Sequence, residues 1–178
     1  MEFVDARKYK KQVIKLYKSA FPKDERYPVP FLFYKADNKN NFFYGVFEEG
    51  EFAGLLYTIH TERMVFTFYL AVVEEMRGRG IGTKILNELS EMHPDKTLIL
   101  TIEDTDKTDA PNIAERLRRL KFYEANGYTR QHIKINEAGV DFEVLGKDNT
   151  VTKDEFINMM KKYLGKLYFK FIYRNMEL

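Results

Sequence analysis

The stretch YLAVVEEMRGRGIGTKIL, residues 69–86, decides the fold class of this chain. Its first residues continue an apolar run over residues 64–73, as expected of a strand that is buried on both faces. Glycines follow at 78, 80 and 82. After them, apolar side chains recur at helical spacing, at Ile85, Leu86, Leu89 and Met92. The order strand, glycine turn, helix is typical of α/β proteins that hold a phosphate group at the start of the helix.

The glycine turn has the chemistry of a phosphate cradle. Small residues let the backbone approach a ligand, successive N–H groups point into one concavity, and the helix start adds partial positive charge. Arg77 and Arg79 add two full charges. The spacing fits neither the P-loop, which needs GxxxxGK[ST], nor the dinucleotide fingerprint GxGxxG. The alternative interpretation is a basic surface turn that only caps a helix.

The rest of the chain predicts one α/β domain with a mixed sheet. Strand signals lie near residues 2–4, 42–47, 52–60, 64–73, 97–102, 128–135 and 140–145. Helical patterns lie near residues 13–20 and 31–36, from the glycine turn to about 92, from Pro111 to Asn126–Gly127, and from Thr152 to about 163. Thr152 and Glu155 have capping-box spacing. Residues 167–173 fit either a helix or a strand.

Composition narrows the function. The chain has 178 residues, a formal net charge of +2 and no cysteine. The small net charge argues against a dedicated nucleic-acid binder, and the missing cysteine excludes disulfides and thiolate metal sites. We expect no metal, no nucleic acid and no membrane span. Since residues 1–11 have no apolar core of signal-peptide length, we expect a cytoplasmic location.

Two motifs resemble the GNAT superfamily of acyltransferases. The spacing Arg77-x-x-Gly80-x-Gly82 resembles its acetyl-CoA loop, [QR]xxGx[GA], and LKFYEANGY at residues 120–128 resembles its second signature. The resemblance covers about residues 42–145. FPKDERYP at Phe21 and TIEDTD at Thr101 are similar to a bacterial subgroup whose substrates are poorly assigned.

The resemblance implies a single acetyltransferase domain over residues 1–178. Its core would span about 42–145, and a C-terminal helix and tail would span 152–178. The expected fold is a mixed, mostly antiparallel, splayed β-sheet flanked by α-helices.

The resemblance also implies acetyl-CoA as acyl donor. Carried over by position, the pyrophosphate would meet backbone amides of Gly78, Gly80, Gly82 and Thr83, with Arg77 and Arg79 nearby. The pantetheine arm would pair like an extra strand with backbone groups of Leu70 and Val72. One of those amides would polarise the acetyl carbonyl.

Tyr123 occupies the family position of the general acid. A phenol titrates near ~10 and a thiol near ~8.5, so a tyrosine stays protonated at neutral pH and can protonate a departing thiolate. No single residue is clearly identified as the general base. Some relatives carry a Glu where this chain has Phe66, which leaves Glu103, Glu25 and, less favoured, His60 or His132. A water chain to bulk solvent would also suffice.

The predicted reaction is direct attack of a primary amine, on a small molecule or peptide, on acetyl-CoA in a ternary complex. The chain would act as a monomer or homodimer. One alternative is a non-catalytic acyl-CoA-binding sensor. Another is an interaction module that uses the aromatic, basic tail from Tyr163 to Arg174.

Overall fold

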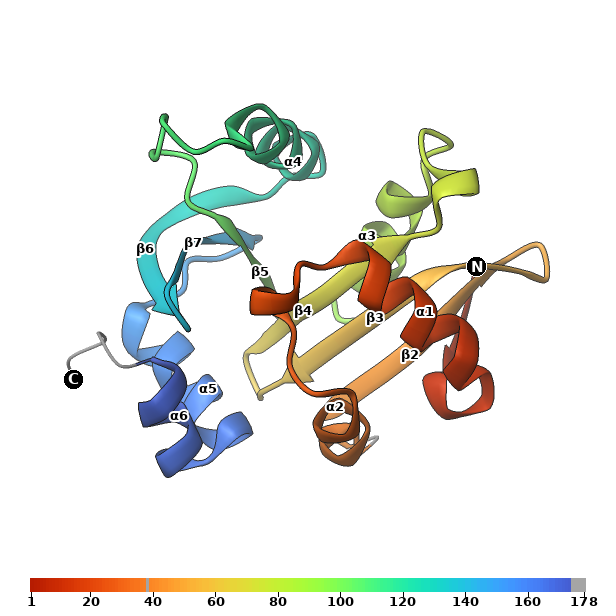
Figure 1. Cartoon of the computed structure of the whole chain (residues 1–178), viewed down its shortest axis with the longest axis horizontal. Coiled ribbons are helices and arrows are strands. Elements are labelled where there is room, and N and C mark those ends of the chain that lie inside the picture. Colours follow the sequence, from red (N-terminus) through yellow and green to blue (C-terminus); the bar gives the residue numbers. More distant parts are fainter. Residues whose placement is uncertain (38, 174–178) are drawn as a thin grey trace. The chain divides into compact units, whose positions relative to one another are not determined.

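The computed structural model describes residues 1–37 and 39–173. Its residues cluster into two compact units, Met1–Lys96 and Thr97–Leu178, whose strands and helices are drawn in Figure 1. In each unit, antiparallel strands are flanked by helices, so the predicted α/β class with a mostly antiparallel sheet is confirmed.

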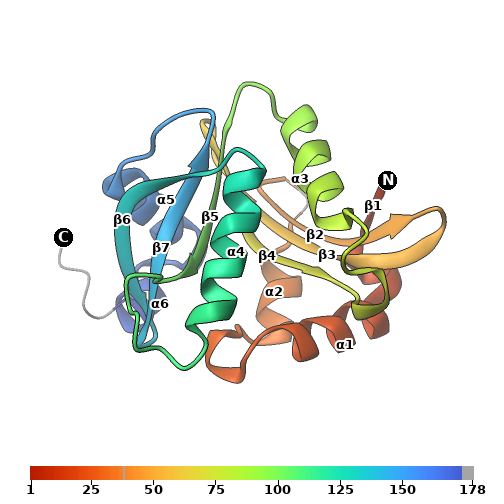
Figure 2. The same ribbon diagram turned by 90° about the horizontal axis from the view of Figure 1, so that it is seen from above.

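The first unit is a four-stranded antiparallel ladder in the order β1-β2-β3-β4. Helices α1 and α2 cover one face and α3 covers the other, as Figures 1 and 2 both show. The strands are β1 (Glu2–Asp5), β2 (Asn41–Glu48), β3 (Glu51–His60) and β4 (Met64–Val72). The helices are α1 (Lys10–Ala20), α2 (Val29–Lys35) and α3 (Ile81–Met92), with short 3-10 turns η1 (Ala6–Tyr9), η2 (Lys23–Glu25) and η3 (Glu74–Met76).

The interior of the first unit is rich in aromatic rings. Tyr17, Tyr57 and Phe66 are almost completely buried. The T-shaped contact of Tyr17 with Tyr69 ties α1 to β4, with ring centroids 4.9 Å apart. Close approach of β3 to β4 requires Gly54, because a Cβ there would lie 2.4 Å from the Ala71 oxygen. The ring contact and the close backbone approach therefore hold β4, the strand that precedes the glycine turn, in place.

The second unit is a three-stranded antiparallel ladder in the order β5-β7-β6. In both ribbon views α4 lies on one side of this ladder and α5 and α6 lie on the other (Figures 1 and 2). Its elements are β5 (Thr97–Glu103), α4 (Ile113–Ala125), β6 (Thr129–Glu137), β7 (Val140–Lys147), α5 (Lys153–Leu164) and α6 (Lys166–Ile172).

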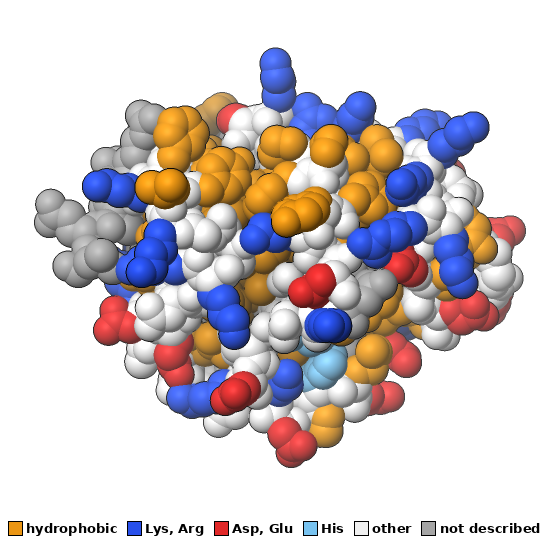
Figure 3. Space-filling view, turned by 90° about the horizontal axis from the view of Figure 1, so that it is seen from below, with side chains coloured by type: hydrophobic (Ala, Val, Ile, Leu, Met, Phe, Trp, Pro, Cys, Tyr) orange, Lys and Arg blue, Asp and Glu red, His pale blue; other side chains and the backbone are white. Residues whose placement is uncertain are grey.

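The C-terminal helices follow the sequence signals in part. The capping box of α5 forms as predicted, with Thr152 accepting from the Glu155 backbone N–H and Glu155 accepting from that of Thr152. The tail, undecided from sequence, is helix α6, and Arg174 lies outside the described residues. Leu167 and Phe171 of α6 are 88% and 59% exposed. Figure 3 shows hydrophobic side chains at the surface among lysines and arginines on the face seen from below.

Among the described helices, none has the length and apolarity that crossing a membrane requires.

Candidate functional site

The backbone of β4 presents alternate polar groups away from β3. The Val73 N–H donates to the Ala53 carbonyl at 2.9 Å, and the Ala71 carbonyl points at Gly54. Backbone groups alternate in direction along an antiparallel strand, so those of Leu70 and Val72 point away from β3. This is the orientation that pairing with an extended ligand requires.

The glycine turn adopts a conformation that favours glycine. Gly78 and Gly80 have φ angles of 73° and 77°, in the left-handed region. An added Cβ at either position would meet nothing within 4 Å, so the space beside the turn is open. The run from Arg77 to Gly80 is exposed to solvent. The turn therefore offers its backbone to a ligand.

Helix α3 begins with unused amide donors. Gly80 is its N-cap residue and has no side chain to cap it. The first bond of the helix runs from the Lys84 N–H to the Gly80 carbonyl, at 3.0 Å. The amides before Lys84, from Gly80 to Thr83, therefore have no partner inside the helix. A row of such amides at a helix start is a binding site for an anion such as a phosphate.

The two arginines of the turn differ. Arg79 is exposed. Arg77 reaches back to β4, where its Nε donates to the Val72 carbonyl at 3.2 Å. In this arrangement Arg77 links the strand and the turn, the two parts expected to hold one ligand.

The segment between α1 and α2 is fastened to the first unit by two phenols. The Tyr69 hydroxyl on β4 donates to the Glu25 carbonyl at 2.8 Å and accepts from the Tyr27 N–H at 3.3 Å. The Tyr17 hydroxyl donates to the Tyr27 carbonyl at 3.0 Å. Glu25, a predicted base, is thus held beside β4 through its backbone. Phe66, where some relatives carry a Glu, is buried.

Glu103, the other predicted base, lies at the end of β5 in the second unit, and its carboxylate already has partners. Arg116 NH2 pairs with Oε1 at 2.8 Å, and Arg119 NH2 pairs with Oε2. The Asn112 Nδ2 also donates to Oε1, at 3.0 Å. An amine or water could reach this carboxylate only by displacing one of these donors.

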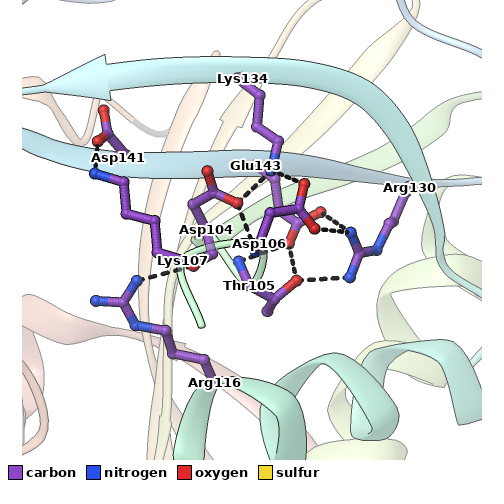
Figure 4. Close-up of polar contacts among 9 residues, drawn as sticks. All are labelled: Asp104, Thr105, Asp106, Lys107, Arg116, Arg130, Lys134, Asp141 and Glu143. Carbon is purple, nitrogen blue, oxygen red and sulfur yellow. Dashed lines mark hydrogen bonds and ion pairs between the residues drawn. The ribbon is translucent and has the colours of Figure 1, made fainter. Parts of the chain in front are cut away.

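The turn after β5 is held by a network of charged groups, drawn in Figure 4. The buried Glu143 of β7 accepts from the backbone N–H of Thr105 at 3.1 Å and from its hydroxyl at 2.5 Å. From β6, Arg130 donates to the Thr105 hydroxyl at 2.6 Å and pairs with Asp106 at 3.0 Å. Lys134 pairs with Asp106 at 2.8 Å. These contacts fix the segment that leads into α4.

Tyr123 lies in the last turns of α4, partly exposed, and its ring contacts those of Phe122 and Tyr128. Burial raises the pKa of the Tyr123 phenol to about 12, while the Arg119 cation acts in the opposite direction. The hydroxyl is therefore protonated at neutral pH, which is the form that a general acid needs.

His60, a less favoured base, lies at the end of β3 with its Nε2 2.9 Å from the Thr58 hydroxyl. Its ring contacts that of His93, with centroids 4.8 Å apart. Burial, with the nearby His93 and Lys96, lowers the pKa of His60 to about 4. His60 is therefore neutral at pH 7. His132, the remaining histidine named from the sequence, is exposed on β6.

The partly buried His60 predicts a pH dependence of stability. The folded pKa of about 4 lies below the ordinary value of 6.5, so the unfolded chain takes up the proton first as the pH falls. The stabilisation is present above pH 6.5 and is lost as the pH falls towards 4. Between pH 7 and pH 5 we expect a loss of about 1 kcal/mol, after allowance for solvent screening of a partly exposed group. Urea unfolding at pH 7 and at pH 5 measures it.

The matched variant for this prediction is His60→Gln, which keeps a hydrogen-bonding group but does not titrate. Its stability should fall less than that of the wild type over the same pH range. The exposed His132 provides the control, because His132→Asn should retain the wild-type pH dependence. Equal pH dependence in the wild type and His60→Gln would rule out this role for His60.

Sequence reasoning missed the partners of the named residues. Tyr69 and Tyr17 were not expected to hold the segment at Glu25, and Arg116 and Arg119 were not expected to pair with Glu103. One signal was available. Arg116, Arg119 and Tyr123 are spaced by three and then four residues, which places them on one helix face.

The sequence pattern of the acetyltransferase (GNAT) domain matches residues 39–130, just over half of the chain. YjbC of Bacillus subtilis (strain 168), whose name carries a provisional assignment as an acetyltransferase, is 26% identical over 109 residues. The match covers 57% of this chain and 54% of YjbC, so the chain spans about half the length of this curated relative.

Solved structures share the fold. One is a protein of Bacteroides thetaiotaomicron provisionally assigned to the GNAT acetyltransferases, with a TM-score of 0.75 and 17% identity. The match covers 94% of this chain and 98% of that one. Another is Arabidopsis thaliana Naa50 in complex with the bisubstrate analogue CoA-Ac-MVNAL, with a TM-score of 0.62 and 20% identity. That match covers 83% of this chain and 97% of Naa50. At these sequence identities the similarity shows a shared fold and nothing more specific.

Proposed function

Because this chain belongs to the GNAT family of acetyltransferases, we propose that it transfers an acetyl group from acetyl-CoA to a primary amine of a small molecule or peptide. The observation that carries the proposal is the start of α3. There the open, left-handed glycines and the amides without intrahelical partners lie directly after β4. A pyrophosphate is one of the anions that such a row of amides can bind.

The acyl donor would extend from the turn along β4. Its pyrophosphate would accept from the amides of Gly78, Gly80, Gly82 and Thr83, with Arg77 and Arg79 supplying positive charge. The pantetheine arm would pair with backbone groups of Leu70 and Val72, which point away from β3. The complex of Naa50 with a bisubstrate analogue supports this donor for the family. An amide of β4 would then polarise the thioester carbonyl.

In the proposed reaction, the neutral amine attacks the carbonyl carbon directly in a ternary complex. A C–N bond forms, the C–S bond breaks, and the thiolate leaves with the electron pair of that bond. The phenol of Tyr123 gives its proton to the sulfur, and the new amide nitrogen loses its extra proton to solvent or to a base. Tyr123 is the proposed acid because it occupies the family position of that group and its phenol, with a pKa raised by burial to about 12, is protonated at neutral pH.

That Glu25 or Glu103 acts as the general base remains a prediction. Glu25 is held beside β4 by Tyr69, whereas the oxygens of Glu103 already accept from two arginines. A water chain remains the alternative that needs no such residue. The acceptor site would involve the segment around Glu25. Cytoplasmic location and a monomeric or homodimeric state also stay predictions.

Thiol release tests the proposal directly. The protein is incubated with acetyl-CoA and a panel of small amines and peptides, and free CoA is followed with a thiol reagent. The chain contains no cysteine, so the protein itself contributes no thiol signal. Release that requires both protein and amine supports an acetyltransferase. Tight binding of acetyl-CoA without release, for every amine, favours the non-catalytic sensor. Absence of binding contradicts both.

A further inference from the structure

One face of α4 carries two arginines and the proposed acid. Arg116, Arg119 and Tyr123 follow at spacings of three and four residues, so they are neighbours along the helix surface. Both guanidinium groups pair with Glu103, each with a different carboxylate oxygen. The position of Tyr123 relative to β5 is therefore set through the same helix face that Glu103 holds.

Both oxygens of the Glu103 carboxylate are paired with arginines of α4. Its side chain is 7% exposed, and a buried carboxylate is tolerated only when it is paired. Arg116 and Arg119 supply the charges, and Asn112, at the start of α4, supplies a further donor at 3.0 Å. Removing one partner of such a group leaves a buried charge uncompensated. Glu103 thus fixes both α4 and the direction of its arginines.

One nitrogen of the Arg119 guanidinium is buried without a use in this arrangement. Its NH2 pairs with Glu103, whereas its Nε is buried and has no hydrogen-bond partner within the described residues. Buried donors are nearly always paired, so an orphaned one needs an explanation. Arg119 precedes Tyr123 by one helical turn, and its charge acts on the phenol. The guanidinium therefore belongs to a cation one helical turn from the proposed acid, on the same face of α4.

We propose that Arg119 is a positioning residue for Tyr123, and that Glu103 holds its guanidinium in place beside the phenol. This inference rests on the proposed function. When the phenol O–H bond breaks and an S–H bond forms on the departing thiolate, negative charge develops on the Tyr123 oxygen. A fixed cation stabilises that charge without reorganising. Burial alone raises the pKa of the phenol and so opposes release of its proton. The charge of Arg119 acts in the opposite direction and lowers this pKa.

A double-mutant cycle tests the inference. Arg119→Met keeps much of the side-chain length but removes the charge, and it is measured in the wild type and in Tyr123→Phe. The assay is turnover of acetyl-CoA with the amine of the panel that releases thiol fastest. In the wild type we expect a loss in kcat of roughly 10-fold, equivalent to one pKa unit, with KM for acetyl-CoA nearly unchanged. In Tyr123→Phe the same substitution should change kcat by less than about 2-fold, because the coupled group is gone.

Three further variants test whether the charge at position 119 is what acts through Tyr123. Arg119→Lys retains a positive charge and should recover part of the lost kcat. Arg118→Met removes an exposed arginine next in sequence and should leave kcat unchanged. Glu103→Gln keeps the shape of the side chain but loses its charge, so it should resemble Arg119→Met and be silent in Tyr123→Phe.

Each contrary result has a distinct meaning. An equal loss from Arg119→Met in both backgrounds overturns the inference while leaving Tyr123 as the acid. If Tyr123→Phe itself costs nothing, the acid assignment fails and Arg119 has no group through which to act. If Glu103→Gln reduces kcat in both backgrounds and removes an acidic limb from the pH–rate profile, Glu103 is a base and its anchoring role is overturned.

Discussion

Replacing Gly80 by Asp is expected to abolish acetyl-CoA binding while the protein stays folded. Gly80 has a φ angle of 77°, and a side chain there would project into open space. That space is where the pyrophosphate is proposed to lie. A carboxylate about 4 Å from a phosphate charge costs about 4 kcal/mol near a protein surface, roughly 1000-fold in Kd. Titration calorimetry with acetyl-CoA measures the loss.

Two controls separate charge from strain in this prediction. Gly80→Asn has nearly the same shape without the charge and also tolerates the left-handed conformation, so it should retain part of the affinity. Gly50→Asp places the same side chain in the turn between β2 and β3, at a φ angle of 81° and with equally open space. It should bind acetyl-CoA normally. Unchanged affinity in a folded Gly80→Asp protein would show that the cradle is assigned wrongly.

Removing the hydroxyl of Tyr123 should slow turnover by roughly 10²- to 10⁴-fold, the contribution of a general acid. Tyr123→Phe keeps the ring and its contacts with Phe122 and Tyr128, so the packing of α4 should survive. Affinity for acetyl-CoA should change much less, because the proton transfer takes place in the transition state. Steady-state kinetics with the best amine of the panel, together with calorimetry, measures both quantities.

Two other outcomes of the Tyr123→Phe experiment would be informative. Turnover close to that of the wild type would make Tyr123 a packing residue, with water supplying the proton to the sulfur. A parallel fall in turnover and in acetyl-CoA affinity would make the hydroxyl a binding contact. Circular dichroism and the urea midpoint of the variant establish that neither result comes from unfolding.

Helices and strands could be predicted from the sequence where the pattern that specifies them lies within a few consecutive residues. The helix expected from Pro111 to Asn126–Gly127 is α4, Ile113–Ala125, because apolar spacing and terminal residues act within a few positions. The run at residues 166–172 is a helix that its sequence did not distinguish from a strand. Its seven residues span about two helical turns, too few for an apolar repeat to separate the two alternatives.

The candidate site could be predicted only in its backbone part. Glycine spacing reveals a left-handed turn and a helix start because both are properties of consecutive residues. The partners of Glu103 are not of this kind. Arg116 and Arg119 meet it only after α4 packs on β5, so the sequence showed a carboxylate but not that its oxygens were occupied. The same holds for Tyr69, which contacts Glu25 from a distant strand.

The fastening of the segment around Glu25 has a consequence for how this protein can diversify. Its backbone is secured by hydroxyl groups of Tyr17 and Tyr69, which belong to α1 and β4. Lys23 and Asp24, in contrast, are exposed to solvent. Substitutions at these two positions should therefore be tolerated, since the anchoring groups lie elsewhere. If the acceptor binds at this segment as proposed, a combinatorial library at Lys23 and Asp24 would alter acceptor preference, and the two phenols are the positions to keep constant.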